Sequence, residues 1–186
     1  MAMPAQSLDW TAAAAIALPA DGNRYEVLDG ELFVTPAPSL MHQLALHLVE
    51  RQLAPYIAEH SIGWLLHSPA DLVLSSNTLV QPDLFVVPLR LGSRPRSWSD
   101  IKELELVIEV LSPSTARADR HRKRLVYQAN GVPEYWIVDV DAQCVERWRP
   151  GDERPEVLAE QLVWQPSAAT EPIVLDLPSL FAEMQR

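Results

Sequence analysis

Residues 104–115 read LELVIEVLSPST, and this stretch decides the fold that the sequence predicts. Its first eight residues are almost continuously apolar, which is typical of a strand buried on both faces of a sheet. Ser112 to Thr115 then end the strand and are suited to begin a helix. We therefore expect a central strand at 104–111, followed by a helix at 116–129 that Asn130 and Gly131 terminate.

The segments around this strand predict further strands and one long helix. Asp29-Gly30 lies between two alternating runs and predicts a hairpin at 24–35. Ser39 is suited to cap a helix that extends to about His60, with Pro55 as a point where the helix stops or kinks. The other expected elements are strands at 64–75 and 78–88 that form a second hairpin through Asn77, a surface loop at 89–100, paired strands at 134–140 and 145–149, and a short helix at 177–184.

This order predicts an α/β fold with a mixed β-sheet flanked by helices. We expect residues 1–23 to form an N-terminal lead-in and residues 24–186 to form a single domain, since no composition shift or repeat divides them. A chain of 186 residues with 48% hydrophobic content is large enough for one sizeable core.

Composition also limits the classes of protein and site. Cys144 is the single cysteine, which excludes an intramolecular disulfide and a four-thiolate zinc site. No apolar run is long enough to cross a bilayer, and no basic residue precedes the alanine-rich segment 11–18, so we expect no membrane span, no secretory signal and a cytoplasmic location. The net charge of −10 argues against a basic surface spread over the whole molecule.

Two carboxylates are the strongest candidates for chemistry. Glu109 interrupts the apolar run of the central strand, where a carboxylate is rare unless it is paired or bound to a cation. Asp83 follows Pro82 at the start of another apolar run. If the two acids converge from neighbouring strands, oxygen-only ligation favours Mg²⁺ or Mn²⁺. The alternatives are that Glu109 reaches solvent or an arginine near the strand end, and that Pro82-Asp83 simply opens a turn.

A lysine on the following helix completes the candidate site. Asp119, Lys123 and Tyr127 are spaced four residues apart, so they share one helix face. Lys123 is suited to orient an attacking water or to stabilise charge on phosphorus, whereas the alternative is an exposed ion pair with Asp119. Tyr127 and Gln81 are expected to orient the carboxylates from behind.

The same helix carries a cluster of positive charge in an acidic chain. Arginines at four positions are candidates to contact a DNA backbone, although a charged helix face is often only solvated: Arg117, Arg120, Arg122 and Arg124. His42, in the first turn of the long helix, is a candidate to contact a phosphate or the metal shell, although a histidine near a helix cap is more often only a surface residue. Glu26 and Glu31 flank the first hairpin turn, and Glu31 is retained as a supporting residue that completes a metal shell. Tyr135 and Trp136 are expected in the core or in a homodimer interface.

Several blocks together resemble the bacterial Uma-two group of restriction endonucleases, within the PD-(D/E)XK nuclease superfamily. They occur in the family's order at 25–31 (YEVLDGE), 38–42 (PSLMH), 80–83 (VQPD), 107–115 (VIEVLSPST) and 131–139 (GVPEYWIVD). The resemblance implies a restriction-endonuclease-like core and Mg²⁺-dependent cleavage of DNA. Asp83 matches the aspartate of the motif and Glu109 its second acid. Position 111 is leucine where the motif has lysine, and Lys123 matches the members that carry this lysine on the next helix.

The sequence thus favours a metal-dependent endonuclease that hydrolyses DNA. Two alternatives stay open at this point. The first is a catalytically inactive, oligomeric or DNA-associated module on the nuclease scaffold, which the acidic charge and the displaced lysine favour. The second is a metal-dependent hydrolase of a small phosphoester, which would have a closed pocket in place of an open groove.

Overall fold

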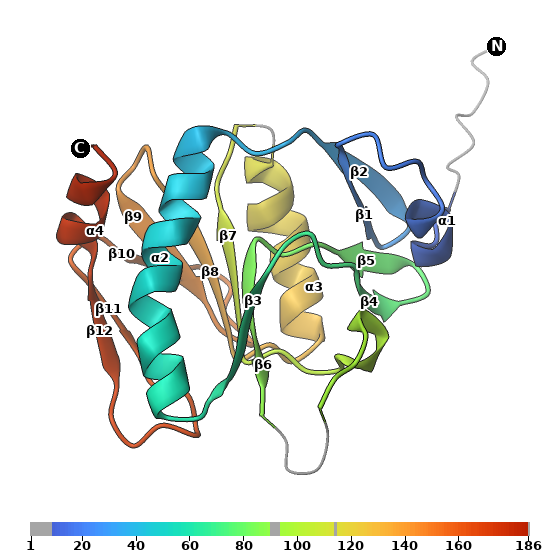
Figure 1. Cartoon of the computed structure of the whole chain (residues 1–186). Helices are drawn as coiled ribbons and strands as arrows, with labels where there is room; N and C mark the ends of the chain where they lie inside the picture. Colours follow the sequence, from blue (N-terminus) through green and yellow to red (C-terminus); the bar gives the residue numbers. More distant parts are fainter. Residues whose placement is uncertain (1–8, 90–93, 114, 186) are drawn as a thin grey trace.

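The computed structural model describes residues 9–89, 94–113 and 115–185. It confirms the α/β class, because a mixed sheet has helices on both faces and a second sheet at its side (Figure 1). In the main sheet β7 and β8 are parallel and the other neighbours are antiparallel. Its strand order is β10 (Glu156–Leu158), β9 (Cys144–Trp148), β8 (Glu134–Asp139), β7 (Leu106–Val110), β6 (Leu84–Pro88) and β3 (Gly63–His67).

The predicted central strand is β7, and all five of its residues are buried. Leu106, Ile108 and Val110 contact the hydrophobic cluster on one face of the sheet, whereas Val107 belongs to the cluster on the other face. The alternation of side chains along a strand therefore places Glu109 on the same face as Val107. This placement points Glu109 toward the helix that follows β7.

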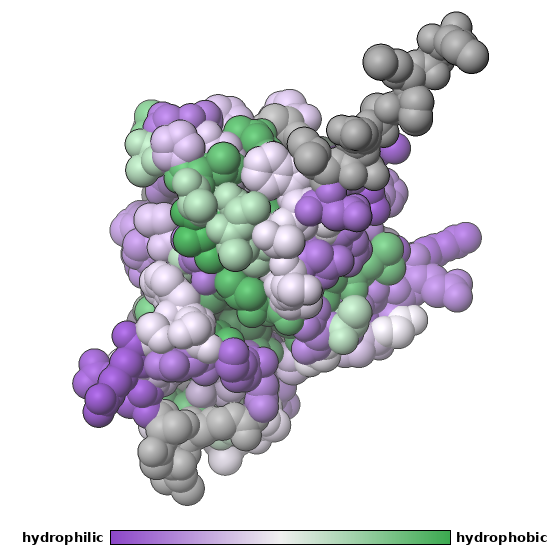
Figure 2. Space-filling view, turned by 90° about the vertical axis from the view of Figure 1, so that its right-hand side faces the viewer, coloured by the Kyte–Doolittle hydropathy of each residue, from purple (hydrophilic) through white to green (hydrophobic). Residues whose placement is uncertain are grey.

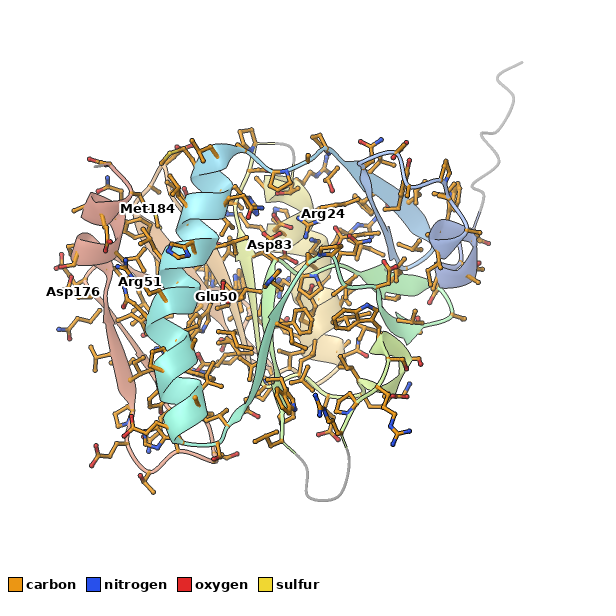
Figure 3. All side chains as sticks on the ribbon, in the orientation of Figure 1. Arg24, Glu50, Arg51, Asp83, Asp176 and Met184 are labelled. Atoms are coloured by element: carbon orange, nitrogen blue, oxygen red, sulfur yellow. The ribbon has the colours of Figure 1, made fainter. Side chains whose placement is uncertain are left out.

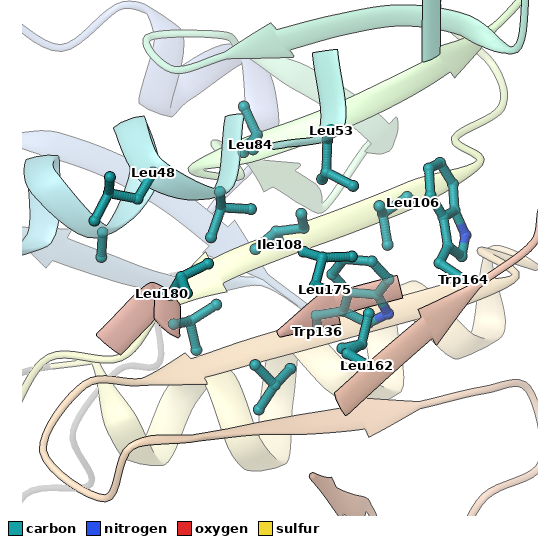
Figure 4. Close-up of a cluster of buried hydrophobic side chains, with 14 of the residues drawn as sticks. Leu48, Leu53, Leu84, Leu106, Ile108, Trp136, Leu162, Trp164, Leu175 and Leu180 are labelled. Carbon is teal, nitrogen blue, oxygen red and sulfur yellow. The ribbon is translucent and has the colours of Figure 1, made fainter. Parts of the chain in front are cut away.

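One long helix covers the first face. Helix α2 (Leu40–Glu59) begins at Ser39, whose Oγ accepts a hydrogen bond from the His42 backbone N–H at 3.2 Å. Pro55 does not end it, and the helix continues to Glu59. This face also receives the two-stranded ribbon β11 (Gln161–Trp164) and β12 (Ile173–Asp176) and the terminal helix α4 (Leu177–Glu183), and their side chains pack with those of α2 and the sheet (Figure 4).

The opposite face is covered by the helix that follows β7. Its first part, η2 (Ala118–Lys123), is a π-helical segment, in which the Arg124 backbone N–H bonds to the Asp119 carbonyl five residues earlier. Helix α3 (Arg124–Ala129) continues it. The predicted helix at 116–129 is therefore present, and Asp119, Lys123 and Tyr127 are all buried on its inner face. Tyr135 and Trp136 lie in the core, where Trp136 packs edge-on against Trp164 at 5.8 Å between ring centroids.

The second sheet confirms the first predicted hairpin and corrects the second. Its order is β2 (Glu31–Thr35), β1 (Arg24–Leu28), β5 (Thr78–Val80) and β4 (Leu72–Ser75). The prediction of continuous strands at 64–75 and 78–88 is wrong: each divides, with β3 and β6 pairing in the main sheet and β4 and β5 in the second. Pro69 and Pro82 lie at these two breaks, where the absence of a backbone N–H interrupts pairing. The break before β6 is the position of Asp83.

The described part of the lead-in, residues 9–23, contains helix α1 (Ala12–Ile16), whose Ala12 and Ala15 pack against the second sheet. Residues 1–8 of the lead-in and 90–93 of the predicted loop 89–100 lie outside the described residues, and the rest of that loop contains the 3-10 turn η1 (Trp98–Asp100). Figure 2 faces the side of the molecule that carries α1 and the second sheet, and it shows apolar surface between hydrophilic groups. In the described ranges, no helix is both long and apolar enough to span a membrane.

Candidate active site

The break between β5 and β6 places Asp83 beside the central strand. Its carboxylate is 3% exposed. Oδ2 accepts a hydrogen bond from the Val110 backbone N–H at 2.9 Å, and Oδ1 lies 2.6 Å from Nη1 of Arg24. Because Val110 directly follows Glu109, the structure brings the two predicted acids to adjacent positions of the sheet. Figure 3 shows Asp83 and Arg24 close together between α2 and the second sheet.

Glu109 points away from solvent, toward the helix that follows its own strand. It is 2% exposed, and its Oε1 accepts hydrogen bonds from Lys123 Nζ at 3.0 Å and from the Tyr127 hydroxyl at 3.1 Å. The alternative in which Glu109 reaches solvent or an arginine therefore does not describe this structure. Tyr127 holds Glu109 directly, as the sequence analysis expected of an orienting residue.

Lys123 lies at the centre of a buried acidic cluster. Its Nζ is 2.9 Å from Glu26 Oε2, 3.0 Å from Glu109 Oε1 and 3.5 Å from Asp119 Oδ1. The spacing of Asp119 and Lys123 does produce an ion pair, but a buried one rather than an exposed one. The π-helical geometry of η2 keeps both side chains turned toward the sheet.

Glu26, rather than Glu31, enters this cluster. Glu31 is exposed and pairs with Arg122 on the surface. Glu26 is 3% exposed, and its second oxygen accepts a hydrogen bond from the Gln81 backbone N–H at 2.8 Å. Gln81 thus orients a carboxylate through its main chain, although that carboxylate is neither Asp83 nor Glu109. Glu26 and Leu28 share one face of β1, and Glu31 lies opposite Leu28 on that same face, so the alternation alone does not distinguish the two glutamates.

His42 and Arg24 complete the surroundings of Asp83. His42 is buried and its Nε2 is 3.2 Å from Asp83 Oδ2, so it is not a surface histidine, and the first turn of α2 reaches the Asp83 carboxylate. Arg24 was not among the residues predicted from the sequence. Its Nη2 also donates to the Gln81 carbonyl at 2.7 Å, while its Nε is buried without a hydrogen-bond partner among the described residues.

The buried charges do not balance. Four carboxylates (Glu26, Asp83, Glu109 and Asp119) face two permanent cations (Arg24 and Lys123), so the cluster has a formal excess of two negative charges. Burial raises the pKa of Glu109 well above its ordinary 4.5, and the attraction of Lys123 offsets only part of this rise. Burial opposes ionisation of Asp83 as well, but His42 and Arg24 outweigh it and hold the pKa of Asp83 below its usual range.

Lys123 keeps its charge in spite of its burial. Burial lowers the pKa of Lys123, but attraction by Glu109, Glu26 and Asp119 is larger and raises this pKa well above 10.5. Burial likewise raises the pKa of Asp119 above its ordinary value. Lys123 is therefore a fixed hydrogen-bond donor and a fixed positive charge at neutral pH.

Two open hollows flank this cluster. The larger, about 600 Å³, is lined by residues of the β2–α2 connection, by His42, and by the chain that follows β7. The smaller, about 400 Å³, is lined by Asp83, His67 and one side of α2. Arg24 and Pro38 line both hollows. The Arg24 guanidinium is therefore part of the wall between the buried acids and the surface.

The donor chemistry fits Mg²⁺ or Mn²⁺. Within the described residues no group of three or more histidines, cysteines and acids is arranged to hold a metal ion. Magnesium sites in proteins often use only one or two carboxylates, with waters and substrate oxygens as the remaining ligands. Asp83 and Glu109 would supply two such carboxylates, and the excess charge of −2 matches one divalent cation.

The four predicted DNA-contacting arginines do not form a surface of free positive charge. Arg120 pairs with Asp139 and Glu146, and Arg122 pairs with Glu31. Arg124 lies over the Trp148 ring, 4.7 Å from its centroid. Arg117 is exposed, and it makes no ion pair with the part of the chain that the structure describes.

Comparison with known proteins agrees with this geometry. A family model named Uma2, described as "Putative restriction endonuclease", matches residues 12–178. A crystal structure from Anabaena variabilis ATCC 29413, described as a putative nuclease belonging to DUF820, has the same fold with a TM-score of 0.77. It is 22% identical, and the match covers 94% of this chain and 99% of that one. No curated protein matches. Since the family model spans most of the sequence, the chain belongs to the Uma2 family, and its function is nuclease-like.

Proposed function

We propose that the protein is an endonuclease that hydrolyses DNA phosphodiester bonds with bound Mg²⁺ or Mn²⁺. The observation that supports this proposal is that Asp83 accepts a hydrogen bond from Val110, the residue after Glu109, while Glu109 contacts the buried Lys123, in a cluster with a formal excess of two negative charges. The raised pKa values of Glu109 and Asp119 reflect the same excess of negative charge, which bound protons or one divalent cation would neutralise.

Asp83 and Glu109 would hold the cation, which when bound lowers the pKa of a water and shields the charge of the phosphate. The chain's own groups set the geometry. The Val110 N–H fixes one oxygen of Asp83, and Tyr127 fixes one oxygen of Glu109. These contacts keep the two carboxylates in place before substrate arrives.

Lys123 would act as a donor and not as a base. Because its pKa is raised, it stays protonated at neutral pH and cannot accept the proton of the attacking water. It holds Glu109 in place and supplies a positive charge beside it. This role suits the orientation of a nucleophile and the stabilisation of developing negative charge.

DNA contact by the arginines of η2 and α3 is part of this proposal. Arg117 is exposed, so it can meet a phosphate without losing an ion pair within the described structure. Arg120 and Arg122 would have to exchange their carboxylate partners for phosphates. The homodimer considered from the sequence stays a prediction.

One observation favours the inactive scaffold as the second candidate. Asp83 and Glu109 each have a cationic partner inside the chain, Arg24 and Lys123. If those ion pairs persist, Arg24 and Lys123 occupy the carboxylate oxygens that a metal ion would need as ligands. Metal titration separates the two functions, because a scaffold of this kind would bind no Mn²⁺ at millimolar concentration.

The nuclease proposal is tested by incubating supercoiled plasmid with purified protein and Mg²⁺ or Mn²⁺. Wild type is compared with Asp83→Asn and Glu109→Gln, which remove charge but keep shape. Glu59→Gln is the matched control, because it removes an exposed acid at the end of α2 that pairs with none of the proposed DNA-contacting arginines in the described structure. We expect nicking by wild type and the control only. Equal nicking by all four proteins would refute the mechanism. Parallel reactions with bis(p-nitrophenyl) phosphate test the alternative of a small-phosphoester hydrolase.

A further inference from the structure

Arg24 occupies a position that the proposed mechanism leaves unexplained. It lies at the start of β1, its side chain is 19% exposed, and it lines both hollows. Nη1 contacts Asp83 Oδ1 at 2.6 Å, Nη2 donates to the Gln81 carbonyl at 2.7 Å, and Nε has no hydrogen-bond partner in the described part of the chain. A guanidinium with five N–H donors is therefore only partly used.

We propose that Arg24 competes with the divalent cation for Asp83, and that metal binding releases its guanidinium to bind a phosphate of the DNA. This inference rests on the proposed function, because it assigns a role within the same site. It makes Arg24 a residue with two alternative partners, one in the metal-free protein and one in the complex with substrate.

The first step follows from the geometry of the Asp83 carboxylate. Oδ2 already accepts the Val110 N–H at 2.9 Å and faces His42 at 3.2 Å. Oδ1 has Arg24 as its partner, so it is the oxygen that a metal can most readily take. A Mg²⁺ ion lies at about 2.0–2.1 Å from its ligand oxygens, which would bring it close to the guanidinium nitrogen. Two cations at that separation repel each other strongly in a buried site.

The second step follows from the place of Arg24 in the wall. Because its side chain borders both hollows, it can leave Asp83 without crossing the packed core. The planar guanidinium matches two phosphate oxygens, which a lysine cannot do. Release would also give the unpartnered Nε an acceptor. Metal binding would thus prepare the phosphate-binding group, which couples the affinities of the two ligands.

The test measures Mn²⁺ affinity without DNA, by titration calorimetry, for wild type, Arg24→Gln and Arg24→Lys. The control is Arg51→Gln, which removes an exposed arginine paired with Glu183 and so changes the net charge equally. We expect Arg24→Gln to bind Mn²⁺ about tenfold more tightly than wild type, Arg24→Lys to be intermediate and Arg51→Gln to be unchanged. At saturating Mn²⁺, Arg24→Gln should nick plasmid at least about tenfold more slowly, because it lacks the phosphate contact.

Equal Mn²⁺ affinity of folded Arg24→Gln and wild type overturns the competition while leaving the metal-dependent function intact. A wild type that binds no Mn²⁺ refutes the metal-dependent function itself, and the inference with it. Should the variants fail to fold, the Arg24 Nε–Hε resonance of the wild type decides. It should shift when Mg²⁺ is added, and an unshifted resonance under saturating Mg²⁺ overturns the inference.

Discussion

Replacing Glu109 by glutamine should stabilise the metal-free protein, because burial and the neighbouring acids disfavour the ionised form of Glu109. It is 2% exposed and its pKa is raised, mainly by burial and then by repulsion from Asp83 and Asp119 after Lys123 has offset part of the effect. Glutamine keeps an oxygen acceptor for Lys123 and Tyr127. It also reduces the formal excess of the cluster from −2 to −1, so Lys123 still has carboxylate partners in Glu26 and Asp119.

We expect Glu109→Gln to raise the free energy of unfolding at pH 7 in EDTA by about 1–2 kcal/mol. Removing one partner of a buried ion pair is destabilising when it leaves an unpaired charge, but Lys123 keeps two carboxylate partners here and the variant removes an excess negative charge. For a chain of this size the melting temperature should rise by roughly 2–8 °C. The assay is urea and thermal unfolding of both proteins. Glu31→Gln, at an exposed position, should change stability by no more than about 0.5 kcal/mol.

The dependence on pH gives a second check. Because the pKa of Glu109 is raised in the folded state, the folded protein binds more protons than the unfolded chain between 4.5 and that raised value. Wild-type stability from this group therefore falls as pH rises through that window. The advantage of Glu109→Gln should be absent below pH 4.5 and should grow above it. A variant that is less stable than wild type at pH 7 without metal would refute the reasoning, because ionised Glu109 would then be a net stabilising group.

Three further predictions test other parts of the structure. Lys123→Met removes the cation shared by three buried carboxylates and should destabilise the protein by about 3–5 kcal/mol, which thermal unfolding measures; a loss below about 1 kcal/mol would contradict the buried network. Gly63→Ala places a Cβ 2.2 Å from the Val87 carbonyl oxygen, so it should cost about 1–3 kcal/mol in urea unfolding, and a neutral effect would contradict the β3–β6 register. Arg117→Ala should leave the melting temperature unchanged but reduce the salt slope of DNA binding by about one, and an unchanged slope would remove Arg117 from the DNA surface.

The local sequence pattern was sufficient to select the buried acids of the central strand and of the helix that follows it. Glu109 is recognisable because its neighbours are apolar, and the four-residue spacing of Asp119, Lys123 and Tyr127 is a property of any helix. Glu31 was chosen over Glu26 although both lie on one face of the hairpin, because the local pattern does not show which part of that face other elements cover. Helix α1 packs with this hairpin, and β5 pairs with β1, at about fifty residues' separation in the sequence.

The local sequence also did not predict that two of the expected strands are each divided between two sheets, because the division depends on pairing with distant segments. Apolar, strand-forming residues stand on both sides of Pro69 and of Pro82, so the pattern alone does not show that the chain changes sheets there. The two prolines were the available signal, since each removes a backbone donor from a ladder. Arg24 was missed for the same reason, because its partner Asp83 is fifty-nine residues away and only the crossing between sheets brings them together.

The buried cluster around Asp83 and Glu109 has an excess of negative charge that the stability of the fold does not require. Packing could have been satisfied at lower cost by apolar side chains in β1 and β7, since replacing buried ionic groups by well-packed hydrophobic ones is often stabilising. The chain instead buries four acids around two cations, and it leaves an oxygen of Asp119 and a nitrogen of Arg24 without hydrogen bonds in the described structure. A site that must accept a divalent cation has a reason to carry this cost, because the ion neutralises the excess only when it is bound. The stability gained by Glu109→Gln and the activity lost in the same variant should therefore have a single cause.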